Sequence, residues 1–143
     1  MNQSQKTLIA PGWFRIAVQA LVMIAESREP CSSAEIAHDV EAHAVFLRRV
    51  LAQLVRADIV HAREGRSGGY QLARPAGQIT LADIYSAVQL TDPPDDDELG
   101  DCQSARLQSA MEDIQQEIEV HALRILSRYT IASLLHRVKQ NLT

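Results

Sequence analysis

The sequence contains little cysteine, with only Cys31 and Cys102 in 143 residues. Two cysteines are too few for the disulfide framework that stabilises small secreted domains. No apolar run approaches the roughly 18 residues needed to cross a membrane, and the first residues lack the charged start and cleavage site of a secretory signal. We therefore expect a cytoplasmic protein with no membrane partner.

Patterns typical of catalysis or metal binding are also missing. No histidine is accompanied by a cysteine or serine in a context that would activate a nucleophile. The glycines at 65–69 do not form a phosphate loop, because neither a Lys-Ser/Thr pair nor a long helix follows them. The acids at 95–98 lack the spacing of an EF-hand loop. We expect no enzyme, and we interpret the acidic stretch as a solvated loop.

Positive and negative charges are separated along the chain, although the net charge is only −4. Residues 44–75 hold six arginines and two acids, a local charge of 6 − 2 = +4. Residues 91–120 hold one arginine and ten acids, a local charge of 1 − 10 = −9. This separation suits a protein that binds DNA with its basic half. The alternative is chance clustering of solvated charges.

The hydrophobic fraction of 46% is sufficient for a core, and the length predicts one domain with an appended oligomerisation element. Apolar spacing predicts a first helix over residues 12–26. Ser32 and Glu35 form a capping-box pattern that opens a short second helix ending at Val40. After a three-residue turn, a third helix is predicted from about Ala44 to Ala57. Its apolar face consists of Leu47, Val50, Leu51 and Leu54.

The second and third helices form a predicted helix-turn-helix. In this motif the second helix enters the major groove of DNA, and its outward side chains reach base edges. Arg48 and Arg49 lie near the start of that helix, where either can bind guanine or phosphate. His43 at the helix start is a candidate backbone contact or a solvated turn residue. Gln53 and Arg56, further along, suit phosphate contact or solvent exposure.

A basic hairpin is predicted directly after the third helix. Its extended runs, Ile59–Arg63 and Tyr70–Ala73, flank a tip in which Gly65, Gly68 and Gly69 are expected to adopt positive φ. Arg63, Arg66 and Arg74 place positive charge on or beside the tip. We interpret it as the wing of a winged helix-turn-helix that contacts phosphates or the minor groove; the alternative is an ordinary surface hairpin. Its candidate DNA contacts are Arg63, Arg66, Ser67, Gly68 and Tyr70.

The remainder of the chain is predicted to be helical around an exposed acidic loop at 91–100. Thr80 and Asp83 can cap a fourth helix, and Thr130 a last helix ending at Lys139. Between them a long helix is expected from about Ser104 to Ser127, with an apolar stripe that suits pairing in a dimer. The alternative is packing on the chain's own core. The stripe consists of Leu107, Met111, Ile114, Ile118, Ala122 and Ile125.

Four motifs resemble the Rrf-two (Rrf2) family of bacterial winged helix-turn-helix regulators, which includes the IscR, NsrR and CymR types. They are Glu35-Ile36-Ala37, Phe46-Leu47-Arg48-Arg49-Val50-Leu51, the wing run from Gly68-Gly69-Tyr70 to Arg74-Pro75, and Ile79-Thr80-Leu81-Ala82-Asp83-Ile84. The resemblance implies a mainly α fold with a small β-hairpin wing and a long dimerisation helix. It also implies a homodimer that binds a partly palindromic double-stranded operator, in many members as a repressor. The expected division is a DNA-binding domain at 1–90, an acidic loop at 91–103 and a dimerisation region at 104–143.

The chain departs from that family in two places. Family recognition helices often carry Tyr-Leu-Glu-Gln where this chain has Phe46-Leu47-Arg48-Arg49, so we expect a different base preference. Iron–sulfur members carry three cysteines near the long helix, whereas only Cys102 lies there, so we expect no cofactor. Cys102, or Cys31, is a candidate redox switch for an oxidant effector, and a small-molecule effector or inert cysteines are the alternatives. A sensor that acts through a protein partner, or an iron–sulfur-dependent regulator, also stays open.

Overall fold

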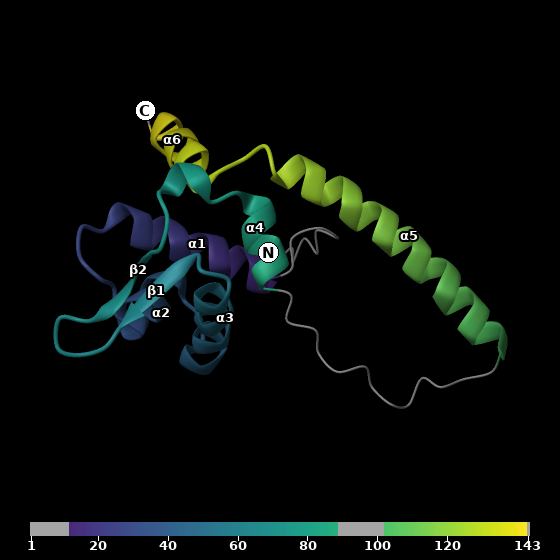
Figure 1. Cartoon of the computed structure of the whole chain (residues 1–143), viewed down its shortest axis with the longest axis horizontal. Coiled ribbons are helices and arrows are strands. Elements are labelled where there is room, and N and C mark those ends of the chain that lie inside the picture. The colour runs from purple at the N-terminus through teal and green to yellow at the C-terminus, as the bar shows by residue number, and fades with distance from the viewer. Residues whose placement is uncertain (1–11, 89–101, 143) are drawn as a thin grey trace.

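Helix α1 (Gly12–Glu26) lies at the centre of the fold and contacts α2, α3, α4, α6 and the second strand (Figure 1). The computed structural model describes residues 12–88 and 102–142. A mainly helical chain with one two-stranded antiparallel sheet confirms the predicted fold class. The other elements are α2 (Ser33–Val40), α3 (Ala44–Arg56), β1 (Val60–Arg63), β2 (Gly69–Leu72), the 3₁₀ helix η1 (Ala76–Gln78), α4 (Leu81–Ala87), α5 (Cys102–Leu126) and α6 (Ile131–Asn141).

Side-chain caps determine where three of the helices begin. At α2 the Ser32 hydroxyl accepts a hydrogen bond from the Glu35 amide, and the Glu35 carboxylate accepts one from the Ser32 amide. Thr80 and Asp83 form the same reciprocal pair at α4. These two boxes confirm the predicted helix starts. Thr130 caps α6 as predicted, with Ser133 as its partner.

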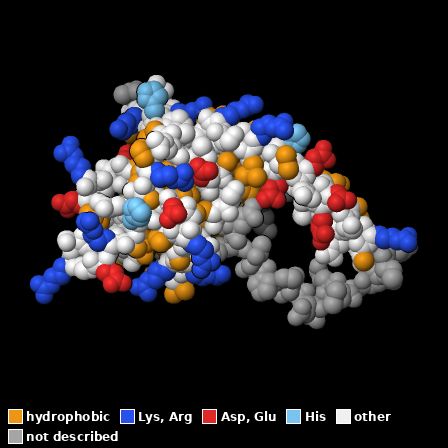
Figure 2. Space-filling model, in the orientation of Figure 1, with side chains coloured by type: hydrophobic (Ala, Val, Ile, Leu, Met, Phe, Trp, Pro, Cys, Tyr) orange, Lys and Arg blue, Asp and Glu red, His pale blue; other side chains and the backbone are white. Residues whose placement is uncertain are grey.

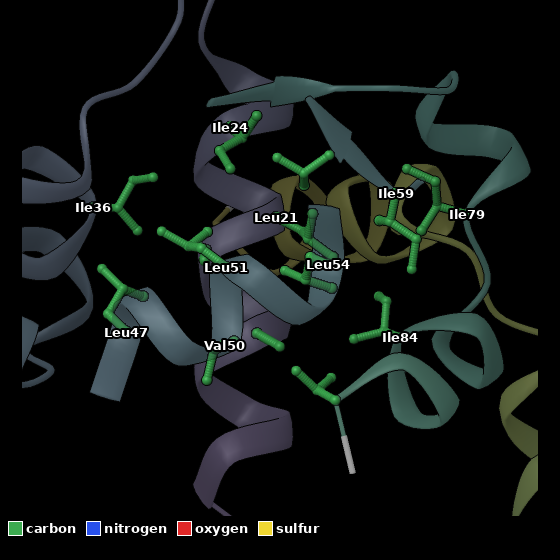
Figure 3. Packing of buried hydrophobic residues seen from close by; sticks show 14 of the residues in the cluster. Leu21, Ile24, Ile36, Leu47, Val50, Leu51, Leu54, Ile59, Ile79 and Ile84 are labelled. Carbon is green, nitrogen blue, oxygen red and sulfur yellow. The ribbon is translucent and has the colours of Figure 1, made fainter. Parts of the chain in front are cut away.

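The core fills the space between α1, α3 and the segments that follow them (Figure 3). All four residues of the predicted apolar face of α3 are fully buried. They pack with Leu21 of α1 and Ile36 of α2, and with Ile59, Ile79 and Ile84 from the later elements. The sequence therefore forces the opposite face of α3, which carries the arginines, to point away from the core.

The hairpin pairs β1 with β2 in antiparallel register, with Val60 opposite Leu72 and Arg63 opposite Gly69. Gly65 and Gly69 have the positive φ values that were predicted, 106° and 147°. Gly68 does not have a positive φ, so that part of the prediction is wrong. Position 68 requires glycine because there is no room for a side chain. A Cβ there would overlap the carbonyl oxygen of Arg63.

Helix α5 extends away from the body of the molecule, and α6 returns to it (Figure 1). A backbone bridge between Thr80 and Thr130 attaches the start of α6 to the start of α4. Helix α5 begins two residues before the predicted Ser104, and α6 continues two residues beyond the predicted Lys139. The predicted acidic loop at 91–100 lies outside the described residues. Residues 102 and 103, which the expected division placed in that loop, belong to α5. Within the described part of the chain, no helix is long and apolar enough to span a membrane.

Candidate nucleic-acid interface

Helix α3 presents its polar face to solvent at the edge of the molecule. Arg48, Arg49 and Arg56 are exposed, and Gln53 is half-buried. His43 is the N-cap residue of α3 and is exposed, but its side chain makes no capping hydrogen bond. The structure therefore brings the helix candidates to one surface, with Gln53 the least accessible of them.

Arg48, Arg49 and Arg56 form no ion pair with an acid of residues 12–88 or 102–142, whereas Arg74, beyond the second strand, lies next to Asp83. Arg48, Arg49 and Arg56 can therefore give their guanidinium donors to an external acceptor. An arginine presents donors in a fixed fork that matches the O6 and N7 atoms of guanine or the oxygens of a phosphate. Figure 2 shows blue Lys and Arg side chains around the α3 and wing end of the body, together with some red acids, and both colours along α5.

The wing lies next to the helix-turn-helix rather than apart from it. Arg63, Arg66 and Ser67 are exposed, whereas Gly68 and Tyr70 are half-buried. A polar pocket lies between the wing and the start of α2, and its lining includes Glu29, Glu35, Arg63 and Arg66. The wing candidates thus combine exposed residues at the tip, including both arginines, with half-buried residues.

Backbone hydrogen bonds attach the wing to the loop between α1 and α2. The Cys31 amide donates to the Tyr70 carbonyl at 3.1 Å, and the Tyr70 amide donates to the Cys31 carbonyl at 2.7 Å. Gly69 allows this approach, since a Cβ there would lie 2.6 Å from the Cys31 oxygen. The Cys31 side chain is buried, and its thiol lies 3.8 Å from the Glu29 carbonyl. Cys31 therefore has a structural position, and the side chain of Cys102 lies outside the described part of the chain.

Arg74 does not belong to the wing tip, contrary to its predicted placement. It lies beyond β2 at the base of the hairpin, half-buried, with its guanidinium 3.9 Å from the Asp83 carboxylate. Asp83 also accepts the capping hydrogen bond of α4. Arg74 thus connects the wing base to α4, a contact between two elements that helical or strand periodicity does not indicate.

The predicted stripe on α5 is exposed except at one position. Ile114 and Ile118 are 50% and 46% exposed, whereas Ala122 is only 7% exposed. Leu107, Met111 and Ile125 are exposed as well. The groove around Ile118 is lined by Ile114, Glu117, Ile118, His121, Ala122 and Ile125. Ala122 is covered by the chain itself, so the alternative of intrachain packing holds for that residue.

An aromatic cluster lies where α1 and α4 meet the long helix. Tyr85 of α4 packs against Trp13 and Phe14 of α1, with ring centroids 5.7 and 5.6 Å apart. Burial, and secondarily the negative charge of Glu119 on α5, raise the pKa of Tyr85. The ring contacts fix α4 on α1, and α4 in turn contacts α5. The apolar side chains in the N-terminal half of α5 are exposed.

Residues 13–137 match the family model of Rrf2, described as an iron-dependent transcriptional regulator. The chain belongs to the Rrf2 family. It is 37% identical over 81 residues to the HTH-type transcriptional regulator IscR of Cereibacter sphaeroides, covering 54% of this chain and 52% of that protein. It is 38% identical over 74 residues to Protein aau3 of Rhizobium meliloti, covering 51% and 48%. The chain spans about half the length of these curated relatives.

A solved structure shows that the fold is shared over nearly the whole chain. The structure of T. potens IscR superposes with a TM-score of 0.67, covering 93% of this chain and 90% of that one. The sequence identity is 23%, so this similarity concerns the fold. It confirms the predicted winged helix-turn-helix with a long C-terminal helix.

The Rrf2 description names iron, but the described residues do not fit an iron site. In residues 12–88 and 102–142, no group of three or more His, Cys, Asp or Glu side chains is placed to hold a metal ion. Thiolates are the usual ligands of iron–sulfur clusters, and the Cys31 thiol lies in the core.

The tight packing of the wing predicts different outcomes for two glycines. Gly68→Ala is expected to destabilise the protein by about 1–3 kcal/mol, because the added methyl overlaps backbone that cannot move without distorting the hairpin. Gly77→Ala is the control, since its Cβ would meet only the Ala132 methyl at 4.0 Å. Urea denaturation of both variants measures the difference. Equal stabilities would contradict the described wing geometry.

Proposed function

We propose that this Rrf2 protein is a homodimeric, DNA-binding transcriptional regulator that acts as a repressor by occupying its operator. One observation carries the proposal: α3 buries its apolar face completely and presents arginines without an acidic partner in the described residues to solvent. Such a helix supplies both the shape and the hydrogen-bond donors that the major groove accepts. Membership of the Rrf2 family supports the same conclusion.

Each candidate residue takes the role that its position allows. Arg48 and Arg49, in the first turns of α3, read base edges. His43 at the N-cap and Arg56 near the C-terminus of α3 contact phosphates on either side of the groove. Gln53 is half-buried, so it contributes a smaller contact with DNA than the arginines do. Arg63 and Arg66 place the wing tip on the flanking backbone or in the minor groove.

The exposed stripe of α5 supports a dimer. Large apolar side chains repeated at helical spacing, each about half exposed, leave apolar surface in water unless a partner covers it. A second copy of α5 presents the same stripe and forms a two-fold symmetric interface. Two recognition helices related by such symmetry would bind a palindromic operator with its half-sites about one helical turn apart, or a multiple of that distance.

Selection from a pool of random duplex DNA tests this function with the full chain. The proposal expects enrichment of one partly palindromic sequence, bound with strong salt dependence. Comparing the reduced and oxidised protein on that sequence then tests the response to oxidants. Affinity lost on oxidation would assign a thiol switch, and equal affinity would direct attention to a small-molecule effector. If no sequence is enriched and affinity does not depend on salt, the protein acts through a protein partner instead.

The wing arginines are expected to contribute affinity without sequence preference. Arg63→Ala and Arg66→Ala should each weaken binding to the operator and to unrelated DNA by the same factor. Each should also lower the slope of log affinity against log salt by about 1 per half-site, or about 2 for the dimer. Titrations at four salt concentrations on both DNAs provide the slope. A loss confined to the operator would show instead that the wing reads bases.

A further inference from the structure

The recognition surface contains an apolar side chain that the arginines do not account for. Val45, in the first turn of α3, is 73% exposed. In the described residues only Leu142, near the end of the chain, is a more exposed large hydrophobic side chain. A β-branched residue also forms helices less readily than alanine. Neither core packing nor helix formation therefore explains valine at this position.

Val45 shares a face of α3 with both base-reading candidates. Residues three and four apart on a helix are surface neighbours, so the Val45 side chain lies beside Arg48 and Arg49. The four buried residues of α3 lie on the opposite side and keep Val45 directed outward. Any duplex that brings the two guanidinium groups to base edges also brings the valine methyl groups into the major groove.

The major groove offers one partner of matching chemistry. Thymine presents its C5 methyl group there, whereas guanine, cytosine and adenine present hydrogen-bond donors and acceptors. An isopropyl group has no hydrogen bond to give to those polar edges and would desolvate them at a cost. Contact with the thymine methyl instead removes apolar surface of both groups from water.

We propose that Val45 selects thymine in each operator half-site by packing on its C5 methyl group. The inference rests on the proposed DNA-binding function and names one base that the recognition helix would select. Each residue advances a helix by about 1.5 Å, and base pairs are about 3.4 Å apart. Three or four residues, about 4.5–6 Å, therefore correspond to roughly one to two base pairs. The selected thymine lies within that distance of the base that Arg48 or Arg49 contacts.

Deoxyuridine substitution in the selected operator tests the contact, because deoxyuridine pairs as thymine does but lacks the C5 methyl group. Each thymine of the half-site is replaced in turn, symmetrically in both halves. At one position the wild-type protein should lose about fourfold in affinity per half-site, the value for one buried methyl group. The Val45→Ala variant should bind the thymine and deoxyuridine operators equally at that position.

Val138→Ala is the matched control, because this half-exposed valine lies on α6, away from α3 (Figure 1). It should keep the wild-type preference for thymine, and unchanged melting temperatures should confirm that both variants are folded. A half-site without thymine within two base pairs of the arginine-read base overturns the inference. So does a deoxyuridine penalty that persists in Val45→Ala. Both results leave DNA binding intact, whereas failure to enrich any operator defeats the proposed function itself.

Discussion

Arg48→Ala and Arg49→Ala are each expected to lower affinity for the selected operator by about 10- to 100-fold per half-site, the range for a lost bidentate base contact. Each should also relax the base preference at one position of the half-site. The physical reason is that the guanidinium donors have no acidic partner in the described part of the chain, so the contact with DNA is not offset by a broken ion pair. Fluorescence anisotropy with the operator and its single-base variants measures both effects.

Lys139→Ala is the control for the loss of positive charge. It removes one exposed charge from α6, which lies on the other side of the body from α3 (Figure 1). This variant should bind the operator as the wild type does, apart from a small salt-dependent change. The role assigned to α3 is contradicted if Arg48→Ala and Arg49→Ala weaken binding no more than Lys139→Ala.

Ile118→Glu is expected to separate the dimer into monomers. The substitution places a charge in the middle of the proposed α5 interface, where an unpaired carboxylate is strongly disfavoured. A monomer holds one half-site only, so operator affinity should fall by about 100-fold or more, the usual gain from linking two binding modules. Sedimentation equilibrium gives the mass in solution, and anisotropy gives the affinity.

Val120→Glu is the matched control, because it introduces the same charge on the same helix. Val120 is 51% exposed, close to the 46% of Ile118, but it points away from the stripe because it lies two residues along the same helix. It should leave the dimer and the operator affinity unchanged. A dimer that survives Ile118→Glu but not Val120→Glu would place the interface on the other side of α5.

Sequence patterns were sufficient where the determinants are local. The Ser32–Glu35 box located the start of α2, and the spacing of apolar residues located the buried face of α3. The same periodicity identified which side of α3 faces solvent. Each of these features depends on residues within one or two helical turns, so its physical cause can be read in the chain itself.

The predictions failed where a residue's position depends on a neighbour that lies outside the pattern used to predict it. Ala122 resembled the other stripe residues, but it is buried against the chain itself. Arg74 is positioned by Asp83, and Gly68 is required by the backbone of Arg63 across the turn. Helical spacing and turn propensity contain no information about which neighbour will occupy a given space.

The central claim, that the α3 and wing surface recognises a specific DNA sequence, is tested most directly by one ratio of affinities. Wild-type protein is titrated with the selected operator and with a shuffled duplex of the same composition at one salt concentration near physiological. The account predicts that the operator binds about 1,000-fold tighter or more, as specific regulators do. Equal affinity for the two duplexes would contradict it.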